Sequence, residues 1–405
     1  MRIFNFQFSI FNFLAICYTT VILSLFFFSF TQVDLGLTLS QWSVWQEFQK
    51  FFQTIGYFQR PFSTVWYTFL LIFLFGFYFA FLYLAQKKLL TEKQITILIL
   101  LTSAILFFSY NAFSYDLFNY IFDVKIVTFY HQNPYTHRAL DYMGNPMLGF
   151  MHWTQRTYPY GPFWLLVTIP FGLLDGFRLL LPTMMLFKGL AFISYLGTVL
   201  FLKKILDKVS PKDALFGIVF FAFNPLVLIE SLVSAHNDIF MMFLSVWAFK
   251  LLLDKKYFRS FLLLVLSIGV KFATVFLIPV FLLIGFLLFK QKKINWNLIF
   301  LIITLFMIFP VVVASVRTNF QPWYLLYILP FVSFLAKKYF ILIPSVVISL
   351  FALFEYAPFL YTGNWNSPIP VLLETIRFVG IGISAFLVVI WFIRNRFLVR
   401  HNVLQ

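Results

Sequence analysis

Long apolar runs recur along the whole chain and constrain its fold more than any other feature. They cover, in approximate bounds, residues 10–31, 63–85, 94–113, 182–202, 213–230, 237–253, 258–289, 297–314, 322–336, 339–360 and 370–393. A helix needs about 20 apolar residues to cross a hydrocarbon core that is roughly 30 Å thick. The run at 258–289 is long enough for two short crossings. We therefore expect an all-α polytopic membrane protein with about 11 to 13 transmembrane helices and interfacial helices in its outer loops.

The composition agrees with this class. Of the 405 residues, 62% are hydrophobic and only 11% are charged, whereas about a quarter of a soluble domain is charged. The single cysteine, Cys17, excludes disulfides and thiolate metal sites. Because the sequence shows no internal repeat and no linker, we expect one transmembrane domain over residues 1–405, with long outer loops at 32–62 and 114–162.

The basic residues gather where the apolar runs end. The net charge of +16 comes largely from clusters at Lys87 and Lys88, Lys203 and Lys204, Lys255 and Lys256, Lys290 to Lys293, Lys337 and Lys338, and Arg394 and Arg396. Such clusters mark cytoplasmic loops, so the charge indicates membrane orientation and no nucleic-acid partner. This orientation places both termini in the cytoplasm and most acidic residues on the outer side of the cell membrane or within it.

The two outer loops predict different structures. The loop at 32–62 mixes Trp and Phe with polar residues at helical spacing, which is typical of an interfacial helix. The loop at 114–162 is followed by the apolar segment 163–177, which Pro170 and Gly172 interrupt. We interpret that segment as re-entrant or interfacial, because it is short and because a further crossing would move Lys203 to the outer side.

Two acids open the second outer loop. Asp116, Tyr120 and Asp123 stand at i, i+4 and i+7, which places them on one face of a helix. An ionised side chain at mid-membrane costs about 2.5 to 3.5 kcal/mol, and less near the interface, so these acids require a partner, water or a function. A salt bridge to Lys125 or Arg138 on a solvated helix is the structural alternative.

A second polar cluster, "ESLVSAHND", contains Glu230, His236, Asn237 and Asp238 between two apolar runs, again on the expected outer side. His236 and Asp238 are metal-ligand types, but no other histidine stands near them in the sequence. An ordinary capped turn, with Asn or Asp opening the next helix, is the alternative.

Two further clusters add bases and aromatic rings. Lys271 lies near the outer turn of the hairpin expected at 258–289, whereas a snorkelling lysine normally lies at a cytoplasmic end. Arg317, Gln321, Trp323 and Tyr324 open a later apolar run from the outside. An arginine beside aromatic rings suits a bound phosphate, although Trp and Tyr are also typical of a membrane interface.

All four polar clusters map to one face of the membrane, which predicts a shared outward-facing cavity. Its acids would contact a sugar hydroxyl, its bases a phosphate, and its aromatic rings a sugar face or a lipid. The sequence contains no Gly-rich loop that would cradle the phosphates of a cytosolic nucleotide donor.

The ordered motifs resemble a known superfamily. "YDLFNYIFDVKIV", "NPY", "YPYGP", "NPLVLIESLVSAHND", "VKFATVFLIP" and "QPWYLLYILP", which span about residues 114–330, are similar to the multi-spanning GT-C glycosyltransferases that take sugar from a polyprenyl-phosphate. The likeness is to the mannosyltransferase-like branch with the alpha-1,6-mannopyranosyltransferases, and more distantly to the GPI mannosyltransferase catalytic subunit.

The resemblance implies catalytic roles for the acids. Asp116 matches the catalytic base of the first large outer loop, and Asp123 matches a second acid that we expect to position the acceptor. Tyr158, Pro159 and Tyr160 depart from the more usual "YPP", which affects the expected fit of donor or acceptor. The expected substrate-binding residues are Tyr120, Lys125, Asn133, Tyr135, Tyr158, Tyr160, Glu230, His236, Asn237, Asp238, Lys271, Arg317, Gln321, Trp323 and Tyr324.

The resemblance further implies an inverting hexosyltransferase. It would move a sugar, with mannose favoured, from a polyprenyl-phosphate donor to a lipid-linked or glycan acceptor on the extracytoplasmic face, among membrane lipids. No motif calls for a cofactor. A divalent metal is neither required nor excluded by the sequence, and no ligand motif supports one. The alternatives are a lipid or glycan transporter or flippase that uses the intramembrane charges, which the lack of inverted repeats disfavours, and a non-catalytic subunit of a glycan assembly complex.

Overall fold

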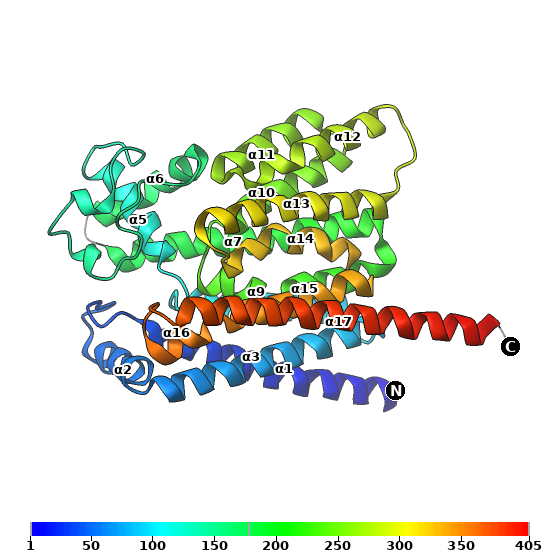
Figure 1. Ribbon diagram of the computed structural model, residues 1–405, viewed down its shortest axis with the longest axis horizontal. Coiled ribbons are helices and arrows are strands. Elements are labelled where there is room, and N and C mark those ends of the chain that lie inside the picture. Colours follow the sequence, from blue (N-terminus) through cyan, green and yellow to red (C-terminus); the bar gives the residue numbers. More distant parts are fainter. Residues whose placement is uncertain (1, 177–178, 404–405) are drawn as a thin grey trace.

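The computed structural model describes residues 2–176 and 179–403, and this part of the chain contains helices and no strand (Figure 1). An isolated bridge joins Arg138 and Thr157. The α-helices are α1 (Arg2–Ser29), α2 (Ser43–Gln53), α3 (Arg60–Gln86), α4 (Glu92–Phe107), α5 (Asp116–Thr128), α6 (Pro162–Gly176), α7 (Leu180–Val209), α8 (Ala214–Ala222), α9 (Pro225–Leu228), α10 (Asp238–Leu253), α11 (Tyr257–Val270), α12 (Ile278–Phe289), α13 (Trp296–Thr318), α14 (Leu329–Val332), α15 (Tyr339–Phe354), α16 (Ala357–Thr362) and α17 (Ile369–Val403).

The all-α polytopic class is confirmed. Among the described residues, seven helical segments are long and apolar enough to cross a membrane, and an eighth is added if the bent pair Pro211–Ala222 and Pro225–Val233 is one span. The seven are Phe11–Gln32, Arg60–Gln86, Leu180–Val209, Phe272–Phe289, Trp296–Thr318, Tyr339–Thr362 and Ile369–Asn395.

This number is lower than the 11 to 13 crossings expected, because several apolar runs form shorter elements. α4 and α10 have 16 residues each and α11 has 14. The run at 322–336 folds as a 3-10 helix, η8 (Pro322–Tyr327), followed by α14 and a second short 3-10 turn. Most residues of this irregular stretch are buried, and irregular backbone is tolerated at membrane depth only inside protein.

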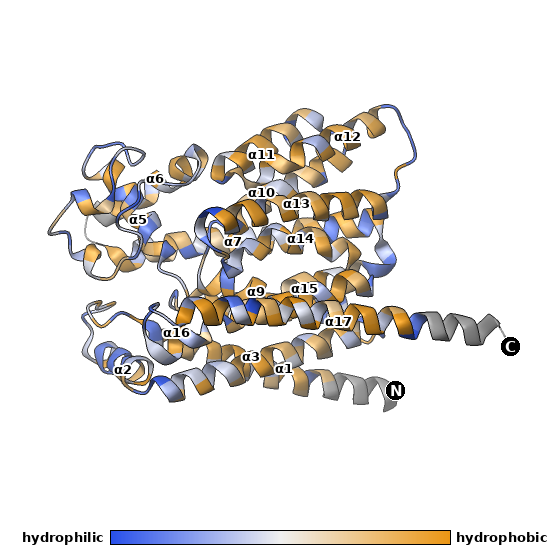
Figure 2. Ribbon diagram, viewed as in Figure 1, coloured by the Kyte–Doolittle hydropathy of each residue, from blue (hydrophilic) through white to orange (hydrophobic). Residues whose placement is uncertain are grey.

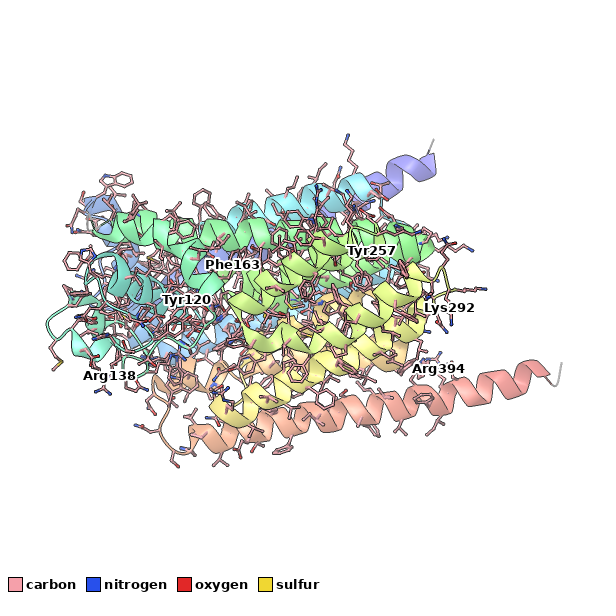
Figure 3. The ribbon with its side chains drawn as sticks, turned by 90° about the horizontal axis from the view of Figure 1, so that it is seen from above. Tyr120, Arg138, Phe163, Tyr257, Lys292 and Arg394 are labelled. Atoms are coloured by element: carbon pink, nitrogen blue, oxygen red, sulfur yellow. The ribbon has the colours of Figure 1, made fainter. Side chains whose placement is uncertain are left out.

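The bundle has two distinct ends, which we call the basic end and the site end. The basic end carries the loops that follow α3, α7, α10 and α12. Lys203 of α7 contacts Glu92 at the start of α4 there, and Lys337 contacts Asp213. In Figure 3, Lys292 and Arg394 lie toward this end and Tyr120 and Arg138 toward the opposite one. α2, α5, α6 and α16 gather at the site end (Figure 1). Apolar residues dominate the helices between the two ends (Figure 2).

Local predictions around the site end agree with the structure. The loop 32–62 contains α2, and a break at Lys271 separates α11 from the 3-10 helix η7 (Phe272–Leu277) that leads into α12. α6 is too short to count among the spanning helices, as expected for the segment 163–177. Residue 177 of that segment lies outside the described residues.

Candidate active site

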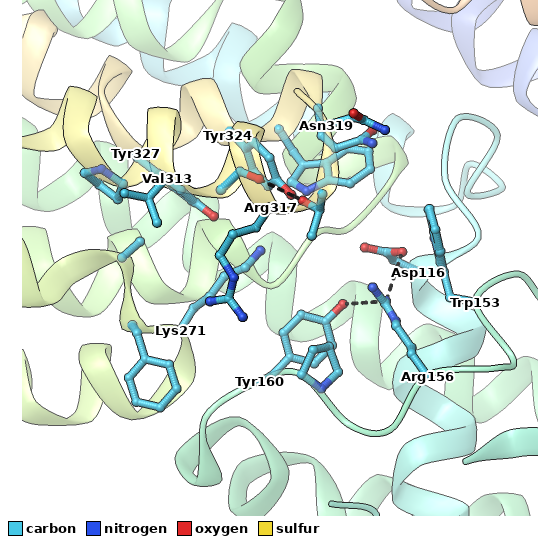
Figure 4. A pocket seen from close by; sticks show the side chains of 18 of the residues that line it. Asp116, Trp153, Arg156, Tyr160, Lys271, Val313, Arg317, Asn319, Tyr324 and Tyr327 are labelled. Atoms are coloured by element: carbon cyan, nitrogen blue, oxygen red, sulfur yellow. Dashed lines mark hydrogen bonds and ion pairs between the residues drawn. The ribbon is translucent and has the colours of Figure 1, made fainter. Parts of the chain in front are cut away.

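A cavity of about 660 Å³ opens at the site end. α5, the loop before α6, η7, the end of α13 and η8 contribute its walls (Figure 4). Its polar and aromatic lining residues are Asp116, Trp153, Gln155, Arg156, Tyr160, Lys271, Phe272, Phe276, Arg317, Thr318, Asn319, Gln321, Trp323, Tyr324 and Tyr327. The cavity therefore combines residues from distant parts of the chain.

Asp116 is the acidic residue of this lining. It is the first residue of α5, its backbone N–H donates to Ser114 Oγ at 3.1 Å, and it is 5% exposed. One carboxylate oxygen lies 3.9 Å from Arg156 Nη2 and the other 3.7 Å from His236 Nδ1. Burial raises the pKa of Asp116, and the positive charges of Arg156 and Lys271 partly oppose this shift. The result is a carboxylate that is more basic than a free aspartate and still has cations to keep it ionised.

Two cations face the same space from other elements. Lys271 Nζ lies 2.8 Å from Asp238 Oδ1 and within 6 Å of the ring centres of Tyr160 and Tyr324. Arg317, near the end of α13, is exposed, and no carboxylate among the described residues lies within ion-pair distance of it. In Figure 4 its guanidinium group lies beside Lys271, across the cavity from Asp116.

Two glycines position the loop that carries Tyr160. The Gly161 N–H donates to the carbonyl of Val270 at 3.0 Å. A Cβ atom on Gly161 would lie 2.2 Å from the carbonyl oxygen of Gly269, so only glycine permits this approach. The contact holds Tyr160 against the end of α11, next to Lys271.

A layer of buried polar residues lies behind the cavity wall. His236 and Glu230 are fully buried, and the His236 ring stacks on Trp323 with its centre 4.0 Å away. Asn237 accepts a hydrogen bond from the Tyr120 hydroxyl at 3.3 Å. The cluster read from "ESLVSAHND" is thus next to the site without lining the cavity.

The predicted site residues fall into three groups. Those in the cavity lining are Asp116, Tyr160, Lys271, Arg317, Gln321, Trp323 and Tyr324. Those in the layer behind it are Tyr120, Glu230, His236, Asn237 and Asp238. Those that the structure does not bring into the lining are Asp123, Lys125, Asn133, Tyr135 and Tyr158.

The residues of the third group have other local roles. The Asn133 side chain accepts from the Tyr135 backbone N–H, and the Tyr135 hydroxyl donates to the Tyr160 carbonyl at 3.2 Å. The buried Tyr158 hydroxyl donates to the carbonyl of Gly161. These contacts shape the loop that carries Tyr160.

Asp123 lies about two turns along α5 from Asp116 and is half-buried. Burial raises its pKa to about 7, and the positive charge of Arg156 opposes this shift. Of the two alternative partners considered for these acids, Lys125 and Arg138, Arg138 contacts Asp141 at 3.1 Å.

Sequence reasoning missed Arg156, Trp153 and Tyr327. The Arg156 guanidinium group lies over the Trp153 ring and donates to the Tyr160 hydroxyl at 3.4 Å. Arg156 stands four residues before Tyr160, next to the motif "YPYGP", and this position in the sequence could have identified it as a candidate site residue. Among the described residues, no group of three His, Cys, Asp or Glu side chains is arranged to hold a metal ion.

Fold and cavity together define a polytopic membrane protein with a charged, aromatic site at one end of its helices. A family model described as "Alpha-(1->6)-mannopyranosyltransferase, N-terminal domain" matches residues 25–286, more than half of the chain. The chain therefore belongs to this family of GT-C mannosyltransferases. No curated protein and no solved structure matches it significantly. The matched range includes Asp116 and Lys271 and ends before Arg317.

Proposed function

We propose that this protein transfers mannose from a polyprenyl-phosphate donor to a lipid-linked or glycan acceptor, with inversion at the sugar carbon C1. The observation that carries the proposal is one cavity in which a buried carboxyl, Asp116, faces the cations Arg156, Lys271 and Arg317. This pairing supplies a base for a hydroxyl and a positive site for a phosphate.

In the proposed step, Asp116 is the catalytic base. The acceptor hydroxyl loses its proton to the Asp116 carboxylate while its oxygen bonds to C1. The bond between C1 and the phosphate oxygen breaks on the opposite face of the sugar, and the lipid phosphate leaves with that electron pair. A free aspartate is a weak base, so a pKa raised by burial favours this role.

The leaving phosphate would contact Arg317 and Lys271. A guanidinium group pairs with two phosphate oxygens at once, whereas an ammonium group acts as a point charge. Since Asp238 already neutralises Lys271, Arg317 supplies the larger uncompensated charge. Cations that meet charge as it develops stabilise the transition state.

Aromatic rings would position the sugar and the start of the lipid chain. Tyr160, Tyr324 and Trp153 line the cavity, and Trp153 is 43% exposed. Aromatic walls with convergent polar groups are typical of ligand sites.

We further propose that the cavity faces the extracytoplasmic side and that one transmembrane domain spans residues 1–405, with outer loops at 32–62 and 114–162. Support comes from Lys292 and Arg394, members of two of the basic clusters that mark cytoplasmic loops, which lie toward the opposite end of the bundle (Figure 3). Asp123 would act from outside the cavity lining, through its charge interaction with Arg156.

The test uses the purified protein in proteoliposomes with an acceptor lipid. Polyprenyl-phosphate mannose, polyprenyl-phosphate glucose and GDP-mannose are compared as donors, and the anomeric configuration of the product is determined. The proposal predicts transfer from polyprenyl-phosphate mannose with inversion. Transfer from GDP-mannose alone, retention of configuration, or lipid translocation without any transfer would overturn it.

A further inference from the structure

His236 does not line the cavity but contacts residues that do. Its Nδ1 lies 3.7 Å from Asp116 Oδ2 and its Nε2 lies 3.3 Å from Glu230 Oε2. Within the described part of the chain, neither ring nitrogen has a hydrogen-bond partner, and Glu230 Oε2 has none either, so both contacts involve groups that are otherwise unpaired. Because the ring is fully buried and stacks on Trp323, it reaches the reacting groups through Asp116.

Glu230 continues this row of polar groups away from the cavity. The Tyr356 hydroxyl, between α15 and α16, donates to Glu230 Oε1 at 2.9 Å. Within the described residues, no Lys or Arg lies close enough to form an ion pair with this fully buried carboxyl. An ionised carboxylate there would be costly, whereas a protonated one can donate from Oε2 to His236.

Hydrogen bonds formed across these two contacts would fix the histidine tautomer. If Nε2 accepts from Glu230, a neutral imidazole carries its proton on Nδ1, which faces Asp116. The other charged groups near His236 are Asp238 and Lys271, which pair with each other at 2.8 Å. Burial, and then the positive charge of Lys271, lower the pKa of His236, so the ring stays neutral.

We propose that Tyr356, Glu230 and His236 form a chain of hydrogen-bond donors that orients Asp116 and favours its ionised form. His236 is then a positioning residue for the base, and this role rests on the proposed function of Asp116. Neither His236 contact is a formed hydrogen bond in this structure, and the proposal requires both to tighten when substrate binds, as catalytic hydrogen bonds often do. A misplacement of about 1 Å at a reacting group costs on the order of 100-fold in rate.

The first test replaces the His236 imidazole by a phenyl ring, which can still stack on Trp323 but has no hydrogen-bonding nitrogen. In His236→Phe, we expect kcat to fall about 100-fold while KM for the donor changes less than about twofold. The acidic limb of the pH–rate profile should move to higher pH, because the ionised carboxylate loses a donor. A wild-type kcat together with an unmoved limb would overturn the inference.

The second test asks whether Glu230 donates a hydrogen bond to His236 or acts as an anion. Glu230→Gln keeps an acceptor for Tyr356 and an amide donor for His236, so its rate should stay within about threefold of wild type. Glu230→Met has no donor and should behave like His236→Phe. Equal losses in the Gln and Met variants would overturn the inference, because they would mean that Glu230 works as an anion.

The matched control is Glu355→Gln, which removes a buried carboxyl that pairs with Arg377 and does not line the cavity. Each variant is compared at equal amounts of monodisperse protein, and if His236→Phe does not fold, the Glu230 pair decides. Wild-type transfer by Asp116→Asn would refute the proposed base itself. An inactive Asp116→Asn beside an unchanged His236→Phe would refute only this inference.

Discussion

The two ends of the bundle use acidic residues in opposite ways. At the basic end, Lys203 contacts Glu92 and Asp207, and Lys337 contacts Asp213, with all of these side chains at least one third exposed. At the site end, Asp116, Glu230 and Asp238 are almost completely buried.

This difference suggests two roles for charged residues: those at the basic end set the orientation in the membrane, and those at the site end take part in the reaction. Exposed ion pairs contribute about 0 to 1 kcal/mol, and salt screens them. A buried carboxyl loses its hydration, and a well-packed apolar residue is often as stabilising or more so. The buried acids of the site end are therefore poorly explained by stability, which supports a functional reading of the cavity.

The largest stability effect is expected for Lys271→Met. Its loss leaves Asp238 as a buried charge without its cation, so the free energy of unfolding should fall by about 3 to 5 kcal/mol. Thermal unfolding in detergent measures this change. Adding Asp238→Asn should restore most of the stability and no transfer activity; a double variant as unstable as the single one would contradict the assignment.

Arg317→Gln should weaken donor binding without affecting the fold. A charged hydrogen bond contributes about 1.5 to 3 kcal/mol, so KM for the donor should rise roughly 10-fold to 100-fold. Initial-rate kinetics against donor concentration test this. Arg138→Gln, which removes an exposed arginine that contacts Asp141, is the control and should leave KM unchanged. Equal KM values for both variants would remove Arg317 from the site.

Arg156→Gln should change the pH dependence of transfer. A base works ionised, so activity falls as pH drops through the pKa of Asp116, which burial places above the ordinary aspartate value. Removing the positive charge of Arg156 raises this pKa further, so the acidic limb of kcat/KM should move to higher pH. A limb that stays in place, or moves to lower pH, would show that Arg156 does not act on the base.

Lys203→Met is expected to have the smallest effect. Its partners lie at the exposed basic end, so stability should change by less than about 1 kcal/mol and the transfer rate should not change. Thermal unfolding and initial rates at low and high salt check this. A loss as large as that in Lys271→Met would erase the contrast between the two ends.

The sequence predicted the features that depend on local pattern. Apolar runs gave the helices, the Trp and Phe spacing gave α2, and the isolated Lys271 marked a real break between α11 and η7. Asp116 and Asp123 both lie on the predicted helix, α5. Seven residues rise about 10.5 Å along a helix, however, so Asp123 lies beyond the cavity lining that includes Asp116.

The contacts that complete the site could not be read from the sequence. His236 meets Asp116 only because the turn before α10 packs against the start of α5, more than a hundred residues earlier in the chain. Arg156 reaches the cavity through a loop whose path depends on the close approach of Gly161 to Gly269. Contacts between residues so far apart in the sequence leave no periodic pattern from which they could be predicted.

The central claim is that Asp116 is the base of a mannosyl transfer, and one rate comparison tests it most directly. Initial rates of transfer from polyprenyl-phosphate mannose are measured for wild type, Asp116→Asn and Asp213→Asn at equal amounts of folded protein. Asp116→Asn should lose at least about 100-fold in kcat, whereas Asp213→Asn, at the basic end, should match wild type. A rate for Asp116→Asn within about twofold of wild type would contradict the account.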